Sequence, residues 1–370
     1  MKKVFLIISA LCFAATTFAV DRFVDAAFGS GNGTTMFSTI NSAIAASSNG
    51  DRILIAAGLY SEGAQTINKS LTIAPQVAGT TVSYAGNLTI TGFAGMKLYM
   101  VGINMGIYSI TGSSNSATTS SKALVSLVDC KLGDLAMNAD NFELLAIRTS
   151  VTNNTTMRYG SFIASKTNNL YIVDEAGSTN TTDKIVLTAD SIMNNFSMRA
   201  DNYALSVSNC ILKNMTFFKW NSSSTVANEF YNNDVLTSAN WMLASGNVPG
   251  YNFKFSSNNF LGTISFNSGG SYSGYPYYTY GYYWDTVVEG SLTYSTTSSL
   301  FPNASSSGFF EWTYNGLDLP CTVPSATDPL VLTKVVGTVG TTVNTGNPNH
   351  EFYDIDLTVS DRGRFGGPNS

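Results

Sequence analysis

The stretch at residues 37–75 reads FSTINSAIAASSNGDRILIAAGLYSEGAQTINKSLTIAP, and it decides the fold. Apolar residues spaced three to four apart at 37–46 predict a short amphipathic helix. A turn at 49–51 and two short apolar strands, at 53–55 and 71–73, follow it. Because an open first strand would recruit another chain, we expect the helix to act as a lid on a stack of strands.

The first residues have the pattern of a secretory signal peptide. Met1-Lys2-Lys3 is basic, residues 4–13 are apolar, and Thr17-Phe18-Ala19 is a small-residue cleavage site. We expect residues 1–19 to be removed and the protein to be secreted or held on the outer cell surface. No later apolar run is long enough to cross a bilayer, so we do not expect a membrane-spanning protein.

Composition narrows the class of protein. Only 12% of the 370 residues are charged, the net charge is −5, and no basic cluster suited to nucleic acid is present. The abundant Ser, Thr, Asn and Gly suit strands and tight turns. After removal of the signal peptide three cysteines remain, so at most one disulfide can form among Cys130, Cys210 and Cys321. We expect Cys130 and Cys210 to be small buried core residues.

Beyond residue 75, short apolar strands recur, and each is closed by a polar turn. Successive copies are 20, 41, 19, 24 and 25 residues apart, and the longest gap holds one further coil with Asn168-Asn169 at its turn. A period of 20 to 25 residues predicts a solenoid. The copies are SLVDCKL around Cys130, AIRTSVT around Ser150, LTADSIM around Ser191, SVSNCIL around Cys210, FYNNDVL around Asp234 and FSSNNFL around Asn259.

A second repeated motif occurs in register with the first. MNADNF at 137–142 matches MRADNY at 198–203, and MRYGSF at 157–162 is a weaker copy. Polar and apolar residues alternate within the coils, as at 204–208, which puts every second side chain inside. The leucine-rich signature is missing. The sequence therefore predicts an all-β fold, a right-handed parallel β-helix with ladders of Asn and Ser at its bends.

The predicted chain has four parts. The signal peptide at 1–19 is followed by an N-terminal cap at 20–50 that contains the short helix. The parallel β-helix occupies 51–320, and an irregular C-terminal closing segment occupies 321–370.

A tyrosine-rich loop is predicted at 268–285, within the β-helix. It has two interpretations: an aromatic platform that stacks on sugar rings or adheres to a surface, or a long loop whose rings cover apolar surface. The candidate ligand-binding residues are Tyr275, Tyr277, Tyr278, Tyr280, Tyr282, Tyr283 and Trp284.

The closing segment holds three spaced acids, Asp354, Asp356 and Asp361. Oxygen ligands at alternating positions are typical of a calcium loop, which makes these acids the candidate metal ligands. Val359 stands where such a loop needs glycine, so a plain closing turn is the alternative. No cofactor is expected apart from this candidate calcium ion.

The opening FVDAAFGSGNGTTMFSTINSAIAASSNGDRILIAAGLYSEG, followed by INKSLTIAP, resembles the N-terminal cap and first coils of the pectate-lyase-like right-handed β-helix superfamily. The ending from Asp354 to Pro368 resembles the closing segment of secreted bacterial β-helix repeat proteins. The resemblance implies a fold. It leaves the activity open, because the superfamily includes lyases, hydrolases, esterases and adhesins.

Each enzyme class of that superfamily requires particular residues in the sequence. Gly58-Leu-Tyr60-Ser-Glu62 resembles the start of pectin methylesterases, but the segments that supply their two aspartates are missing. The paired aspartates and His-Gly motif of polygalacturonase-type hydrolases are missing too. The single histidine, His350, is read as a solvated turn residue.

The lyase branch needs a calcium ion held by carboxylates and a basic side chain that removes a proton. Asp140 and Asp201, with Arg158 and Arg199, are the residues that fit this demand. They recur because the coil recurs, and solvated turn residues with ion pairs between coils are the simpler explanation. A calcium-dependent lyase acting on acidic polysaccharide is therefore the alternative hypothesis.

The first hypothesis is non-enzymatic: a secreted or cell-surface β-helix with a structural, adhesive or carbohydrate-binding role. Its expected partners are polysaccharides or cell-surface components, and nucleic acid is not among them. A regular Thr-x-Thr ladder that continues coil after coil, as a face for ice or crystalline polysaccharide would have, is not evident in the sequence.

Overall fold

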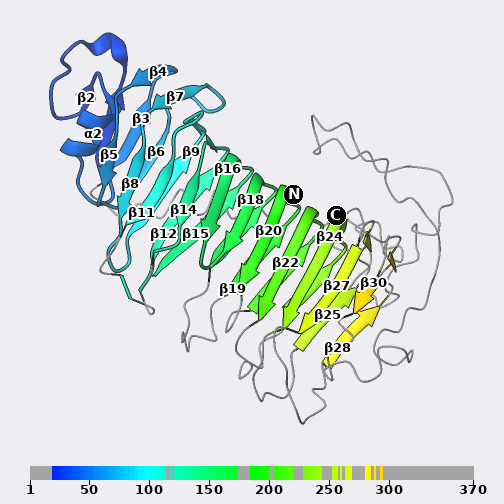
Figure 1. The fold of residues 1–370 in the computed structure, drawn as a ribbon. Coiled ribbons are helices and arrows are strands. Elements are labelled where there is room, and N and C mark those ends of the chain that lie inside the picture. The colour runs from blue at the N-terminus through cyan, green and yellow to red at the C-terminus, as the bar shows by residue number, and fades with distance from the viewer. Residues whose placement is uncertain are drawn as a thin grey trace, which may run out of the picture. The chain divides into compact units, whose positions relative to one another are not determined.

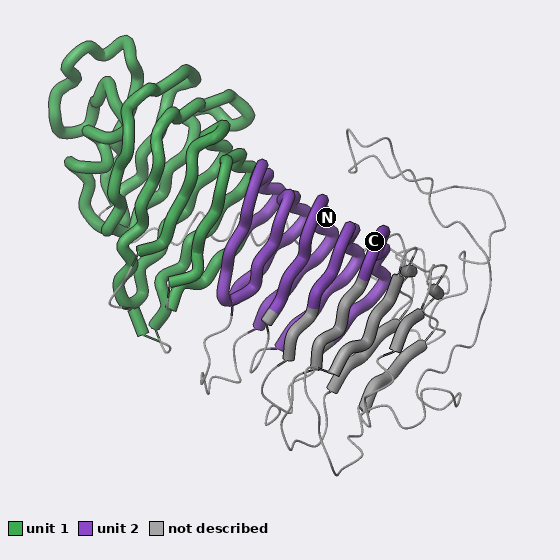
Figure 2. The backbone as a smooth tube through the Cα atoms, in the orientation of Figure 1, with its two compact units in different colours: residues 1–145 green, residues 146–370 purple. Residues whose placement is uncertain are grey.

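The computed structural model describes residues 19–113, 117–118, 121–139, 141–173, 184–199, 204–219, 228–243, 252–256, 259–260, 263–268, 280–284, 287–288 and 292–294. The chain forms two compact units, unit 1 at residues 1–145 and unit 2 at residues 146–370 (Figure 2). The strand β15 (Phe142–Ile147) spans their boundary.

Unit 1 is a stack of short parallel strands (Figure 1). One strand of each coil lies in a first sheet, and two strands lie in a second sheet. The first sheet has the order β2 (Met36–Phe37), β1 (Asp21–Val24), β3 (Arg52–Ile55), β6 (Leu71–Pro75), β9 (Lys97–Val101) and β12 (Ala123–Val128). The second sheet contains the pairs β4 (Gly58–Ser61) and β5 (Gln65–Ile67), β7 (Val82–Ala85) and β8 (Leu88–Thr91), β10 (Ile103–Asn104) and β11 (Ile110–Ser113), and β13 (Lys131–Leu132) and β14 (Leu135–Met137).

Unit 2 keeps the two sheets, but most of its coils place one long strand in the second sheet instead of two short ones. Its first sheet has the order β17 (Gly160–Ile163), β19 (Lys184–Thr188), β21 (Ala204–Ser208), β23 (Asn228–Tyr231), β25 (Asn252–Ser256) and β28 (Tyr280–Trp284). Its second sheet contains β16 (Ser150–Met157), β18 (Lys166–Ile172), β20 (Ser191–Arg199), β22 (Ile211–Lys219), β24 (Asp234–Leu243), β26 (Asn259–Phe260), β27 (Thr263–Ser268), β29 (Val287–Val288) and β30 (Leu292–Tyr294). From β16 to β25 consecutive strands alternate between the two sheets, and each pairs in parallel with a strand of the next coil, which confirms the predicted parallel β-helix.

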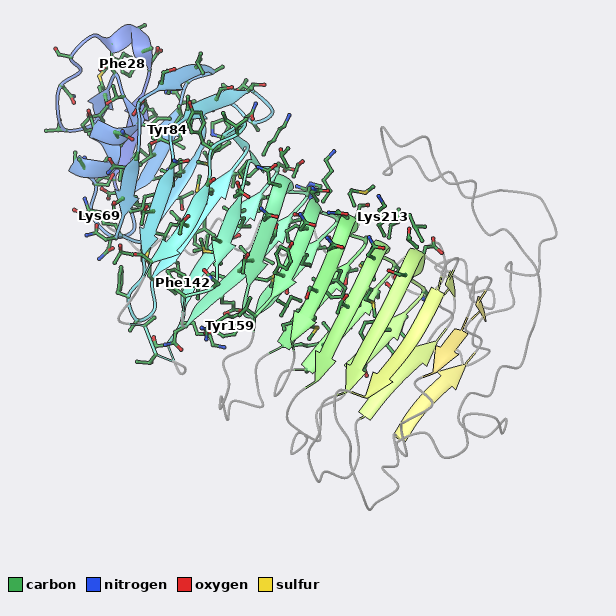
Figure 3. All side chains as sticks on the ribbon, in the orientation of Figure 1. Phe28, Lys69, Tyr84, Phe142, Tyr159 and Lys213 are labelled. Carbon is green, nitrogen blue, oxygen red and sulfur yellow. The ribbon has the colours of Figure 1, made fainter. Side chains whose placement is uncertain are left out.

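Every second side chain points inside, and these side chains stack from coil to coil. Phe162, Leu187, Val207 and Phe230 occupy the same register position in β17, β19, β21 and β23, and each is at most 2% exposed. In unit 1 the ring of Phe142 fills space left by glycine (Figure 3): a Cβ built on Gly92 or Gly112 would lie 2.9 or 3.0 Å from it. Stacked inward rows of this kind are what the alternating sequence pattern predicts.

The predicted helix is α2 (Ile40–Ala46), and it packs against β1, β2 and β3. Ile40, Ala43 and Ile44 are its buried residues, and Ile40 and Ile44 line a small apolar gap together with Ile55 and Tyr84. The helix therefore covers the interior of unit 1 at its N-terminal end, as predicted.

Charged side chains from the first coils hold both ends of α2. The two carboxylate oxygens of Glu62 accept the amides of Ile40 at 2.7 Å and Asn41 at 2.6 Å. At the other end the Lys69 ammonium donates to the carbonyls of Ile44 and Ala45 at 3.0 and 2.9 Å. Each charge is of the sign that the helix dipole favours at its end, which stabilises the lid.

The outer edge of β2 is closed by Asn32. The carbonyls of Thr35 and Phe37 pair with β1, so the polar groups of Met36 point away from the sheet. The side-chain Oδ1 atom of Asn32 accepts the backbone N–H of Met36 at 2.8 Å, and the backbone N–H of Asn32 donates to the Met36 carbonyl at 3.0 Å. One asparagine thus imitates a neighbouring strand and blocks edge pairing.

The turn between the two sheets is the same in successive coils. Its first residue is left-handed, with φ between 48° and 58° at Asp129, Arg148, Ala164, Ala189, Asn209 and Asn232. The next residue is buried, and in unit 2 the turns bond to one another. The Thr149 amide donates to Ser165 Oγ at 2.9 Å, and the Ser165 amide donates to Asp190 Oδ1 at 2.8 Å.

This turn corrects one detail of the predicted repeat. The coil within the gap of 41 residues turns at Ala164, and Asn168-Asn169 lies inside β18 instead. The Asn pair misled because asparagine also favours bends within strands, and the real turn residue is an alanine in a left-handed conformation. Cys130 and Cys210 are buried and unbridged, as predicted.

Candidate functional site

The predicted aromatic platform divides into two parts. Residues 280–284 form the strand β28, which pairs in register with β25, so this part of the tyrosine-rich segment continues the solenoid and is not a loop. Aromatic residues have high strand propensity, which accounts for the difference. The candidates Tyr275, Tyr277 and Tyr278 lie outside the described residues.

The predicted metal ligands Asp354, Asp356 and Asp361 also lie outside the described residues, as do Asp140, Asp201, His350 and Cys321. Arg158 is half-buried and engaged in an interaction, and Arg199 ends β20. Within the residues that the structure describes, no three His, Cys, Asp or Glu side chains gather in a way that could hold a metal ion. No helix in that part of the chain is long and apolar enough to cross a membrane.

The esterase-like step at residues 58–62 has a structural role. Glu62 caps α2, and the hydroxyl of Tyr60 donates to the Ala56 carbonyl at 3.0 Å. Nearby, the Tyr84 hydroxyl lies 2.9 Å from both the Gly63 carbonyl and Asn41 Oδ1 (Figure 3). Burial and the Glu62 carboxylate raise the pKa of Tyr84 to about 12, so this phenol stays protonated. These side chains fasten the lid to the first coil.

Unit 1 presents a column of hydroxyl groups on its second sheet, which we call the threonine face. Thr66, Thr89 and Thr111 stand in register on β5, β8 and β11, and Ala136 ends the column on β14. A second column places Thr91 beside Ser113, with their hydroxyl oxygens 3.0 Å apart. Thr66 and Thr111 are exposed, and neighbouring strands lie about 4.8 Å apart.

Unit 2 presents a ladder of asparagines on its second sheet, at a bulge in the long strands. Asn169 Nδ2 donates to Asn154 Oδ1 at 3.0 Å, and Asn169 Oδ1 accepts Asn195 Nδ2 at 3.2 Å. The series continues with Ser238 Oγ donating to Asn214 Oδ1 at 3.0 Å. The predicted Asn and Ser ladder is therefore present.

A second outward column runs beside this ladder. It consists of Thr156, Tyr171, Ser197 and Thr216, in register on β16, β18, β20 and β22. All four side chains are half-buried. We call the ladder and this column together the amide face of unit 2.

These faces share one chemistry. Hydroxyl and amide groups both donate and accept hydrogen bonds, and they carry no formal charge. Sugar hydroxyls need partners of this kind, and repetition every 4.8 Å or so suits a ligand that is itself a repeating chain.

The sequence contained a signal for the threonine face that the repeat analysis missed. Thr66, Thr89 and Thr111 are 23 and 22 residues apart, and apolar residues adjoin each of them. The spacing equals the coil length, but only β8 has threonine at both positions, Thr89 and Thr91, so no repeated Thr-x-Thr motif marks the face.

Comparison of the chain with protein-family models, with curated proteins and with solved structures finds no match in any of the three. The fold and the chemistry of the outward faces are therefore what bears on function.

Proposed function

We propose that the protein is an exported, non-catalytic β-helix of the pectate-lyase-like class that serves as a scaffold and binds carbohydrate through its sheet faces. The observation that carries the proposal is the outward register of uncharged hydroxyl and amide side chains, on the threonine face and on the amide face. Such a surface offers many weak, repeated hydrogen bonds, which suits adhesion to a polymer better than capture of one small molecule.

The signal-peptide pattern of residues 1–19 supports export, to the medium or to the outer cell surface. A parallel β-helix suits that environment, because each coil is stabilised by packing against the next. Cys130 and Cys210 are buried and form no disulfide in this fold. Polysaccharides and cell-surface components are the partners that this reading implies.

The competing hypothesis is a calcium-dependent lyase, whose candidate carboxylates lie outside the described residues. Two measurements on the purified mature chain separate the two. The first is retardation of the protein in native gels that contain neutral or acidic polysaccharides. The second is the absorbance of unsaturated uronate product, with polygalacturonate as substrate and with or without calcium.

The proposal expects retardation without product. Calcium-dependent product formation overturns it in favour of the lyase. Absence of retardation by every polysaccharide also overturns it, since a scaffold that binds no glycan lacks the proposed role.

A further inference from the structure

The aromatic residue of the amide face stands alone among short side chains. Tyr171 lies on β18 between Thr156 on β16 and Ser197 on β20, in register with both. Threonine and serine are too short to cover a phenol ring, and Tyr171 is only half-buried. Its hydroxyl donates to no residue in the part of the chain that the structure describes.

The nearest outward neighbours of Tyr171 are short polar side chains and one exposed valine. Along its own strand the nearest outward neighbours are Asn169 and Val173, and Val173 is 36% exposed. On the neighbouring strands Asn154 and Asn195 flank Asn169 in register. The ladder fixes their amides, with Asn169 Nδ2 held 3.0 Å from Asn154 Oδ1. An aromatic ring is thus bordered by amides whose orientation is set in advance.

From this arrangement we infer that Tyr171 is the centre of a binding subsite for a neutral sugar residue of a polysaccharide. The C–H face of a pyranose ring would stack on the phenol ring, and its hydroxyls would bond to the amides and hydroxyls around it. The inference rests on the proposed function and narrows it to one subsite and one class of ligand.

The uncharged direct neighbours of Tyr171 suit a neutral sugar better than a uronate. Six outward neighbours of Tyr171 carry no formal charge, and the remaining two diagonal positions are Arg158, which is half-buried and engaged in an interaction, and Arg199 at the end of β20. The exposed Lys213 lies two strands away on β22 (Figure 3), too far along the sheet to pair with a carboxylate on a sugar centred at Tyr171. A uronate centred on Tyr171 would meet no cation among the direct register partners of that ring, Thr156 and Ser197.

Pre-ordering of the amides adds to the affinity expected of such a subsite. Free asparagine side chains lose rotamer entropy when they bind, whereas the ladder has already fixed Asn169 and its neighbours. Tyr231, on β23 of the first sheet in unit 2, lies outside this ladder. Its register neighbours are Ser208 and Ser256, which makes Tyr231 a matched comparison for Tyr171.

The test is native affinity electrophoresis of the mature chain in gels that contain hydroxyethyl cellulose, galactomannan, laminarin or polygalacturonate. Wild-type protein should be retarded by at least one of the three neutral polymers. Tyr171→Ala should weaken that retardation about tenfold or more, as expected for loss of a central aromatic anchor. Tyr231→Ala should leave it unchanged, and Tyr171→Phe, which keeps the ring, should bind within about twofold of wild type.

Far-ultraviolet circular dichroism confirms that each variant is folded, and Tyr171→Phe provides a test even if the alanine variant is not. Normal binding by Tyr171→Ala, loss of binding by Tyr171→Phe, or retardation by polygalacturonate alone would each overturn the subsite and leave the scaffold proposal standing. Retardation by none of the four polymers would overturn both.

Discussion

Arg22 and Asp51 form a buried ion pair at the N-terminal end of unit 1. The Arg22 Nη2 and Nε atoms lie 2.7 and 2.8 Å from Asp51 Oδ2, and the two side chains are 10% and 2% exposed. Asp51 also accepts the amides of Val20 at 3.0 Å and Ser48 at 2.8 Å. One carboxylate therefore joins β1, the segment after α2 and β3.

Replacing Asp51 by asparagine should destabilise unit 1 by about 3 kcal/mol, because it leaves the Arg22 guanidinium buried without its counter-charge. The measurement is the denaturation midpoint together with hydrogen exchange at β1. Asp21→Asn is the matched control, since Asp21 pairs with Arg52 in an exposed bridge at 2.6 Å. That bridge should contribute at most about 1 kcal/mol. Equal losses in the two variants would show that burial of the first pair does not matter.

The same pair gives the stability of unit 1 a dependence on pH. Burial alone would raise the pKa of Asp51, but hydrogen bonds from the Ser48 and Val20 amides and the Arg22 guanidinium outweigh it and hold the pKa below its ordinary value. The stabilisation is then complete above the unfolded pKa and is lost as the pH falls through the folded pKa. The difference in stability between wild type and Asp51→Asn should therefore shrink in acid.

Removing the cap of α2 should loosen the lid. Glu62→Ala leaves the amides of Ile40 and Asn41 without their acceptor, and we expect a loss of about 2 kcal/mol. Hydrogen exchange of residues 40–46 should accelerate. Glu143→Ala, at an exposed position on β15, should change stability by less than about 0.5 kcal/mol. Unchanged exchange in Glu62→Ala would mean that the carboxylate does not hold the helix.

The asparagine ladder should contribute to the stability of unit 2. Asn169→Ala removes hydrogen bonds to Asn154, Asn194 and Asn195, and the expected loss is about 1–2 kcal/mol because the groups are partly exposed. The adjacent exposed Asn168 is the matched control, and its replacement by alanine should have little effect on the denaturation midpoint. If both variants have the same denaturation midpoint, the ladder does not contribute to the stability of unit 2.

At the left-handed turns, we predict a substitution that stabilises the protein. Ala164 has φ 49°, a conformation that is strained for alanine and free for glycine. Ala164→Gly should raise the stability of unit 2 by about 0.5 kcal/mol. Ser161→Gly, at an extended position of β17, should lower it by a similar amount. A fall in the denaturation midpoint for both variants would contradict the turn geometry.

Much of the fold could be predicted from the sequence because it is local or periodic. Residues 37–75 specified the lid helix, and the recurring strands specified the solenoid. The position of each turn was harder, because Asp, Arg, Ala and Asn all occupy the left-handed position. No single residue type marks it.

The hydrogen bonds between residues far apart in the sequence, and the outward faces, could not be predicted in this way. Asn32 bonds to the edge of β2 as a neighbouring strand would, and Glu62 caps a helix that lies more than 20 residues earlier in the sequence. Neither of these hydrogen-bonded contacts follows from the periodicity of the sequence. The threonine face depends on the register of coils whose turns differ in length. The sequence does not mark Tyr171, because an isolated aromatic residue can be recognised as a candidate site only once its neighbours in the sheet are known.

The most direct test of the central claim, that the sheet faces bind polysaccharide, is hydroxyl-radical footprinting of the mature chain with and without the neutral polymer that retards it most. Tyrosine rings oxidise readily when exposed, so the method reads Tyr171 and Tyr231 in one experiment. The account predicts that the polymer protects Tyr171 and leaves Tyr231 unchanged. Absence of protection on both sheet faces would contradict the central claim, and protection of a sheet face without Tyr171 would contradict the subsite alone.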